Sequence, residues 1–225
     1  MPYYYWDPTY ILVLIGALLS VGASALVNRT FNRYSSVYAR SGLTGAQAAQ
    51  KLLHSQGIYD VQIQHISGSL TDHYDPRNKT LSLSDAVYNA TTVAAIGVAA
   101  HECGHAISIR SALVPVVNFG SYLSWPLIVI GLFINSSTGS LFLNAGLLLF
   151  SLVVLFQLVT LPVEINASRR AVRLLDQEHI LIGDEVGRTA RVLKAAALTY
   201  VASAAASILQ LLRLLILTGG RRRDD

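Results

Sequence analysis

The five residues from His101 to His105 are of types that could do chemistry together. They read His-Glu-Cys-Gly-His, which is the H-E-x-x-H pattern. Side chains four residues apart lie on one face of a helix, so His101 and His105 can bind the same metal ion. Glu102 cannot ligate that ion from its position, but it can take the proton of a metal-bound water. The pattern therefore predicts a zinc hydrolase, with a protease as the first choice.

The sequence before the motif favours the helix that this chemistry needs. Asn89, Thr91 and Thr92 are N-cap residue types, and the small apolar stretch 93–100 follows them. We therefore expect one helix over residues 92–109. The alternative is a structural pair of core histidines. It is disfavoured because two histidines and a glutamate on a nearly buried helix are costly to desolvate without a metal or other partners.

The composition indicates a membrane protein. Hydrophobic residues make up 52% of the 225 residues, charged residues only 13%, and the mean hydropathy is +0.46. A soluble domain usually carries about 25% charged residues. A bilayer span needs about 20 mostly apolar residues. The uncharged runs predict a mainly α-helical membrane protein with about four transmembrane helices, over residues 9–27, 113–134, 141–161 and 195–217.

The distribution of charge predicts how the chain lies in the membrane. No Lys or Arg precedes the first apolar run, so we expect an uncleaved helix and not a signal peptide. All 17 basic residues come after that helix, which places the N-terminus outside and the polar segments 28–112 and 162–194 in the cytoplasm. The basic residues 221–223 conflict with a fourth full span, so the side of the C-terminal tail stays open. The net charge of +4 needs no nucleic acid, because anionic lipid explains it.

The polar segment 28–112 reads as a small α+β subdomain of the zincin kind. Thr44 and Gln47 fit a capping box for a helix that runs to about Gln56. A strand edge beside the metal helix would hold an extended substrate by backbone hydrogen bonds. Alternation of apolar and polar residues predicts two half-exposed strands with a turn-forming segment between them, over residues 61–66, 80–84 and 72–78 respectively.

A catalytic zinc site usually takes a third protein ligand. The metzincin pattern is excluded, because no histidine occurs between His105 and His179. The chain enters the membrane after Arg110 and returns near Pro162, and a two-helix hairpin brings the returning end back to the face it left. Glu164 is the first acidic residue on the return, and we predict it as the third ligand. The alternative is that Glu164 is not a ligand and only stabilises the N-terminus of a helix that begins there.

Further side chains are predicted around the metal. Ser168 lies one helical turn after Glu164 and suits a hydrogen bond to a ligand. Cys103, the one cysteine, is expected to be a small buried residue and not a ligand. His73 could approach the metal or the substrate, and His73 and His179 are the alternatives for the third ligand. A developing oxyanion needs a donor, for which the candidates are His179, Arg169, Arg170, Arg173 and Tyr200.

These residues resemble those of a known family. The motif at 101–105, the membrane hairpin, and Glu164 with the Ala-Ser-Arg-Arg-Ala stretch 167–171 resemble the bacterial membrane zinc metallopeptidases called YugP-like. The segment 71–76, Thr-Asp-His-Tyr-Asp-Pro, resembles theirs too, and the likeness covers most of the chain. More distantly, the chain is similar to gluzincin membrane proteases of the HtpX and CAAX-processing type, whose third ligand lies in an E-x-x-A-D helix. Here Ser168 stands where their Asp would be.

The sequence thus predicts a zinc-dependent membrane endopeptidase, formed by residues 1–225 as a single membrane-embedded domain. Zn²⁺ held by His101, His105 and Glu164 would activate a water, with Glu102 as the general base. We expect a multi-pass protein of the bacterial plasma membrane that acts at the membrane surface, with its active site on the cytoplasmic side. Its substrates would be membrane proteins or unfolded polypeptides.

Other functions remain open at this point. One is a non-catalytic metal-binding accessory or assembly protein, which would need the metal but not Glu102. A transporter is a distant third choice, because the predicted spans carry almost no ionisable residues. The same ligand types can also hold iron. A homo-oligomer or a membrane partner protein is compatible with the sequence.

Overall fold

The structure is a computed structural model that describes residues 7–107, 124–130 and 137–221. The chain divides into two compact units, which are treated separately below. The helical unit consists of Met1–Ala23, Ala112–Leu161 and Tyr200–Asp225. The mixed unit consists of Ser24–Ser111 and Pro162–Thr199, and it contains the H-E-x-x-H motif. That the whole chain acts as a single domain stays a prediction.

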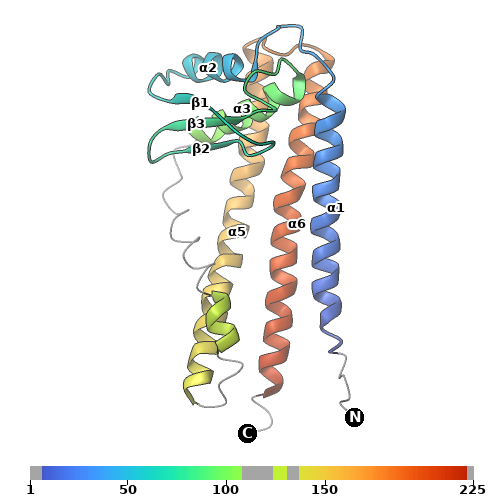
Figure 1. Cartoon of the computed structure of the whole chain (residues 1–225), viewed down its shortest axis with the longest axis vertical. Helices are drawn as coiled ribbons and strands as arrows, with labels where there is room; N and C mark the ends of the chain where they lie inside the picture. Colours follow the sequence, from blue (N-terminus) through green and yellow to red (C-terminus); the bar gives the residue numbers. More distant parts are fainter. Residues whose placement is uncertain (1–6, 108–123, 131–136, 222–225) are drawn as a thin grey trace. The chain divides into compact units, whose positions relative to one another are not determined.

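Three helices in the described residues are long and apolar enough to cross a membrane. They lie within α1 (Tyr10–Tyr34), α5 (Ser137–Gln177) and α6 (Asp184–Arg221), and their mean hydropathies are 2.3, 2.3 and 1.8 (Figure 1). Each helix is longer than the span predicted within it. The remaining predicted span, residues 113–134, lies mostly outside the described residues. The described part of it, residues 124–130, is helical.

Helix α5 differs from the prediction in one way that matters for the site. We expected Glu164 to begin a new helix after Pro162, but α5 continues through both residues. A proline inside a helix removes one backbone hydrogen bond and usually kinks or ends the helix. Here the helix is kept because the turns after Pro162 bury an apolar face in the core of the mixed unit, formed by Ala167, Ala171, Leu174 and Leu175. Glu164 therefore does not serve as a helix N-terminal residue.

Among its described residues, the helical unit contains an ion pair between α6 and the residue Asp7 before α1. Arg213 of α6 lies 3.3 Å from the carboxylate of Asp7, and its guanidinium lies 4.1 Å from the ring centroid of Tyr10. α1 and α6 also approach closely at another point, where a Cβ on Gly16 would lie 3.1 Å from the Cα of Ala206. Arg213 is thus paired within the unit, as a charge inside an apolar helix requires.

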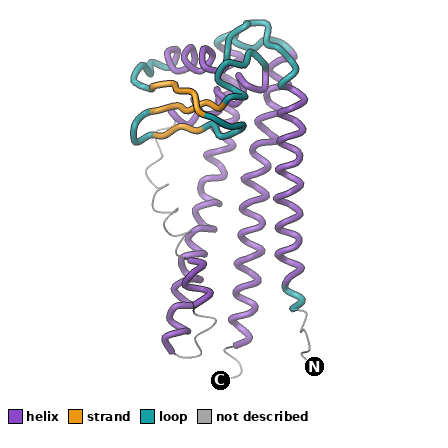
Figure 2. Tube along the Cα trace, in the orientation of Figure 1, coloured by secondary structure: helices purple, strands orange, loops and turns teal. Residues whose placement is uncertain are grey.

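The mixed unit carries a three-stranded sheet in the order β1-β3-β2, with strands β1 (Gln62–Ile66), β2 (His73–Asp75) and β3 (Thr80–Ser84) (Figure 2). β1 runs parallel to β3, and β2 runs antiparallel to it. We predicted β3 as half-exposed, but every residue of it is buried because it is the central strand. β2 falls in the segment predicted as a turn, so that prediction was wrong for these three residues.

Two helices pack beside this sheet. Helix α2 (Gly45–Ser55) begins with the predicted capping box, in which Thr44 and Gln47 each bond the other's backbone N–H (Figure 1). Helix α3 (Val93–Ile107) begins after Thr92, whose hydroxyl accepts a hydrogen bond from the Ala95 N–H at 3.3 Å. Ten residues of α3 are buried, so its position in the mixed unit is fixed along most of its length. This well-packed helix carries the H-E-x-x-H motif.

Candidate metal centre

Two helices of the mixed unit bring three ligand atoms together. Helix α3 supplies His101 and His105, and α5 supplies Glu164. The two histidine Nε2 atoms are 3.2 Å apart, and Glu164 Oε2 lies 3.4 Å from His101 Nε2 and 3.3 Å from His105 Nε2. These are the three residues that the sequence placed in one metal site, and the described residues form a possible His-His-Glu site for a metal ion.

The spacing of these atoms fits a tetrahedral ion. Ligand atoms that lie about 2.0–2.1 Å from one tetrahedral zinc are about 3.3 Å from each other. The measured separations of 3.2, 3.4 and 3.3 Å agree with this value. Glu164 Oε2 is also buried, and the two histidine Nε2 atoms near it are too far or poorly aligned to satisfy it with a regular hydrogen bond. A buried carboxylate oxygen that is poorly satisfied is costly, and a cation between the three atoms would satisfy it.

A glycine lets the two helices approach closely enough to form this site. A Cβ on Gly104 would lie 3.0 Å from the carbonyl oxygen of Ala167 and 3.3 Å from its Cα. The obstructing atoms belong to the backbone of α5, so they cannot turn aside as a side chain could. Gly104 lies one residue before His105, and Ala167 lies one helical turn after Glu164. The contact between them therefore sets the distance between the ligands of α3 and the ligand of α5.

We expect Gly104→Val to weaken zinc binding about tenfold or more. The added side chain would push α3 away from α5, and even a small shift would spread the ligands beyond their bonding distances. Isothermal or competition titration with zinc on the detergent-solubilised chain measures this. Gly187→Val on α6 is the matched control, because a Cβ at Gly187 meets nothing within 4 Å. Wild-type zinc affinity in Gly104→Val would show that the close approach is not needed.

Ser168 contacts the ring nitrogen of His101 that does not face the other two ligands. Its hydroxyl lies 3.1 Å from His101 Nδ1, and both side chains are buried. If His101 uses Nε2 for a metal, its Nδ1 carries the proton and donates to Ser168 Oγ. Such an outer hydrogen bond holds a ligand ring in one tautomer and one orientation. Ser168 can supply this bond although it is not a carboxylate.

Glu102 lies in surroundings that suit a residue that takes and returns a proton. Burial raises its pKa above the ordinary glutamate value, the two histidines act in the opposite direction, and the Glu164 and Asp72 carboxylates add to the rise. A general base works best when its pKa moves towards neutral pH. Asp72 itself is fixed just before β2, because it accepts hydrogen bonds from the backbone and hydroxyl of Ser84.

Cys103 faces away from the ligands. It is fully buried, and its Sγ contacts the backbone oxygen of Ala49 on α2 at 3.6 Å. Burial raises the pKa of its thiol far above the ordinary cysteine value. A protonated thiol is neither a good metal ligand nor a nucleophile. The structure thus agrees with Cys103 as a small packing residue.

The other predicted site residues are not among the three converging ligands. His73 is exposed on β2, with its Nδ1 3.0 Å from the Thr71 carbonyl oxygen. His179 is exposed beyond the end of α5, which lies about 20 Å along the helix from Glu164. Arg170 is half-buried on α5. Arg169 and Arg173 are exposed on α5, and Tyr200 is exposed on α6.

Sequence reasoning missed two features of the site. One is the contact between Gly104 and Ala167, for which the signal was a pair of small residues beside the ligands on two different helices. The other is Asp72, whose charge adds to the rise in the pKa of Glu102 and which we had not named as a site residue. Its signal was its place in the segment 71–76 that resembles the family.

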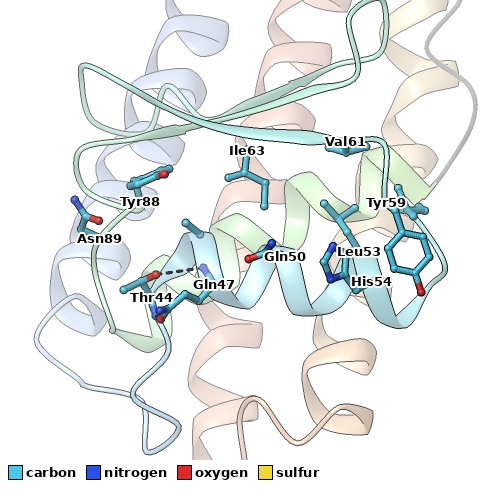
Figure 3. A pocket seen from close by; sticks show the side chains of 12 residues that line it. Thr44, Gln47, Gln50, Leu53, His54, Tyr59, Val61, Ile63, Tyr88 and Asn89 are labelled. Carbon is cyan, nitrogen blue, oxygen red and sulfur yellow. Dashed lines mark hydrogen bonds between the residues drawn. The ribbon is translucent and has the colours of Figure 1, made fainter.

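A separate cavity of about 470 Å³ lies between α2 and β1, and it includes none of the three candidate ligands (Figure 3). Figure 3 shows Ile63 and Val61 of the sheet region facing Gln50 and Leu53 of α2, with the hydrogen bond of the capping box at one end. The cavity belongs to the packing of α2 against β1, and two of its lining residues, His54 and Tyr59, stack with ring centroids 5.0 Å apart.

Comparison with known proteins identifies what the chain is similar to. Residues 9–219 match a family described as "Putative neutral zinc metallopeptidase". The chain is 43% identical over 224 residues to a protein of Bacillus subtilis (strain 168) named "Putative membrane protease YugP", and the alignment covers 94% of this chain and 98% of that protein. No solved structure matches the chain. These matches confirm the resemblance inferred from the residues.

Proposed function

Because the chain belongs to the family described as "Putative neutral zinc metallopeptidase", we propose that it is a zinc-dependent membrane endopeptidase. The observation that carries this proposal is the convergence of His101, His105 and Glu164, whose three ligand atoms lie 3.2 to 3.4 Å from one another. Zinc bound there would supply Lewis-acid chemistry, lowering the pKa of a water molecule and stabilising negative charge on a substrate oxygen.

The residues of the site would each have a separate role in this reaction. His101 and His105 hold the metal from one face of α3, and Glu164 holds it from α5. Ser168 fixes the ring of His101. Glu102, next to His101 but not among the three converging ligands, takes a proton from the attacking water and passes it to the leaving amine.

The sheet offers a place for the substrate backbone. β2 is an edge strand of the sheet and packs against α3, which carries the motif. An edge strand presents unpaired N–H and C=O groups that can pair with an extended peptide. We propose that the substrate is an extended segment of a membrane protein or of an unfolded polypeptide that pairs with β2.

We place this chemistry at the membrane surface on the cytoplasmic side. Helix α5 has 41 residues and is about 60 Å long, about twice the thickness of the hydrocarbon core, so it must extend beyond the membrane. Its uncharged part ends at Val163, and Glu164 is the first charged residue. The ligand would therefore stand at the end of the span, where water can reach it. We propose a multi-pass arrangement in the plasma membrane, and the three candidate spans support the membrane part of this proposal.

Removal of the metal is expected to abolish proteolysis, and zinc should restore it. The test uses the full chain in detergent with fluorogenic casein as an unfolded substrate. We expect 1,10-phenanthroline to lower cleavage at least 100-fold, one equivalent of zinc to restore it, and the non-chelating 1,7-isomer to have no effect. Cleavage by protein shown to be metal-free would contradict the proposal. Bound zinc without cleavage of any supplied membrane-protein or unfolded substrate would favour a metal-binding accessory protein.

A further inference from the structure

A second candidate ligand site lies in the mixed unit between α1 and α6. It is a cavity of about 410 Å³ whose lining includes four cationic side chains, Arg29 and Arg33 from α1 and Arg191 and Lys194 from α6. Tyr34, which is buried, also lines it, and its hydroxyl accepts a hydrogen bond from Arg191 Nη1 at 2.9 Å. None of these residues takes part in the metal centre.

The lining follows helical spacing on both helices. Leu26, Arg29 and Arg33 of α1 lie three and four residues apart, so they share one face of that helix. Lys194 and Leu198 of α6 are likewise four residues apart. Each wall of the cavity is therefore one helical face that carries both cationic residues and a leucine.

No described carboxylate neutralises the positive charge of this cavity. In the part of the chain that the structure describes, no carboxylate lies within 4.0 Å of any of the four cations. Arg33 is positioned over the ring of Tyr34, with 5.7 Å from its guanidinium carbon to the centroid. Like charges around one cavity repel each other, and a bound anion would relieve that repulsion.

Both walls change from charged to apolar at this cavity. Towards the N-terminus of α1 the residues from Thr9 to Val27 carry no charge, and on α6 the residues from Ala195 to Leu212 carry none. Leu26 and Leu198, which line the cavity, are 44% and 39% exposed. A ligand that fills this cavity would thus have an anionic group beside an apolar chain. A free phosphate would contact the cations but not the two leucines. An anionic phospholipid would contact the cations with its headgroup and the leucines with its acyl chain.

We propose that this cavity binds the phosphate headgroup of an anionic phospholipid, with an acyl chain lying along Leu26 and Leu198. The inference rests on α1 and α6 crossing the membrane, and it does not depend on peptidase activity. Arg29, Arg33 and Lys194 bind the phosphate by charge, and the Tyr34 hydroxyl, which accepts from Arg191, donates its own proton to a phosphate oxygen.

The test compares lipid binding by the full chain in zwitterionic detergent, measured by native mass spectrometry. The probes are dioleoylphosphatidylglycerol, dioleoylphosphatidylcholine and inorganic phosphate. We expect one molecule of phosphatidylglycerol to bind at a concentration at least tenfold lower than phosphatidylcholine. Arg29→Gln with Lys194→Gln should remove this preference. Arg77→Gln with Lys79→Gln removes the same charges from the exposed turn between β2 and β3, and it should keep the preference.

The remaining outcomes decide against the proposal. Equal binding of the two lipids by wild type, or an unchanged preference in the Arg29 and Lys194 double variant, would overturn it. Displacement of the lipid by inorganic phosphate at the same concentration would assign a free-anion site instead. The charge-conserving pair Arg29→Lys with Lys194→Arg guards against misfolding and should keep the preference. Zinc content and casein cleavage should be unchanged in the double variant, so failure here is separate from failure of the peptidase proposal.

Discussion

Replacing Glu102 with glutamine is expected to abolish peptide hydrolysis while zinc stays bound. Glutamine has nearly the same shape but cannot take a proton, and general acid–base catalysis contributes about 10²- to 10⁴-fold to such reactions. Glu102 is not one of the three residues whose ligand atoms converge, so the metal centre should survive the change. Cleavage of fluorogenic casein and elemental analysis of the same preparation measure both quantities.

The control for this variant is Glu178→Gln. Glu178 follows the end of α5, away from the motif, and should retain wild-type activity and zinc. Glu102→Gln with undiminished cleavage would remove the general-base role from Glu102. Loss of both zinc and cleavage would mean that Glu102 supports the metal site and would leave its catalytic role without support.

Replacing Glu164 with glutamine is expected to cost the protein its zinc. The substitution turns a charged ligand into a neutral one beside His101 and His105, and a neutral amide oxygen attracts a dication less strongly. The loss of affinity should exceed the about 10- to 100-fold that follows the loss of an outer hydrogen bond to a ligand. Competition with a fluorescent zinc chelator gives the dissociation constant of each form.

Glu178→Gln serves again as the charge-matched control and should keep the wild-type constant. Thermal unfolding in detergent separates loss of the ligand from loss of the fold. A Glu164→Gln protein that is folded and binds zinc as tightly as wild type would show that the third ligand is another residue. His73 would be the next to test, because β2 packs against α3, whereas His179 lies beyond the far end of α5.

Local signals predicted the parts of the fold that depend on neighbouring residues. The capping box at Thr44 and Gln47 forms as expected, because both hydrogen bonds are made within four residues. β2 was not predicted, since its three residues are held by pairing with β3 and not by their own propensity. The burial of β3 was also missed, because alternation along one strand cannot show that strands will lie on both of its sides.

The candidate site was predictable where helical spacing decides it. His101 and His105 are one turn apart in the sequence, and their rings meet in the structure. Glu164 was found by following the chain through the membrane, although the reasoning assumed a helix that begins there. The continuity of α5 through Pro162 depends on packing of Ala167 and Ala171, which the sequence alone does not show. That the three residues act as zinc ligands stays a prediction.

The most direct test of the account is the coordination of the metal itself, measured by X-ray absorption on the purified full chain. The account predicts one zinc per chain, with two imidazole nitrogens and oxygen ligands at about 2.0–2.1 Å and no sulfur. It also predicts that Glu164→Gln, at equal protein concentration, loses this signal. A sulfur ligand at about 2.3 Å would contradict the account. Apart from Met1, the one residue of this chain that could provide it is Cys103. A purified, folded protein that binds no stoichiometric zinc would also contradict the account.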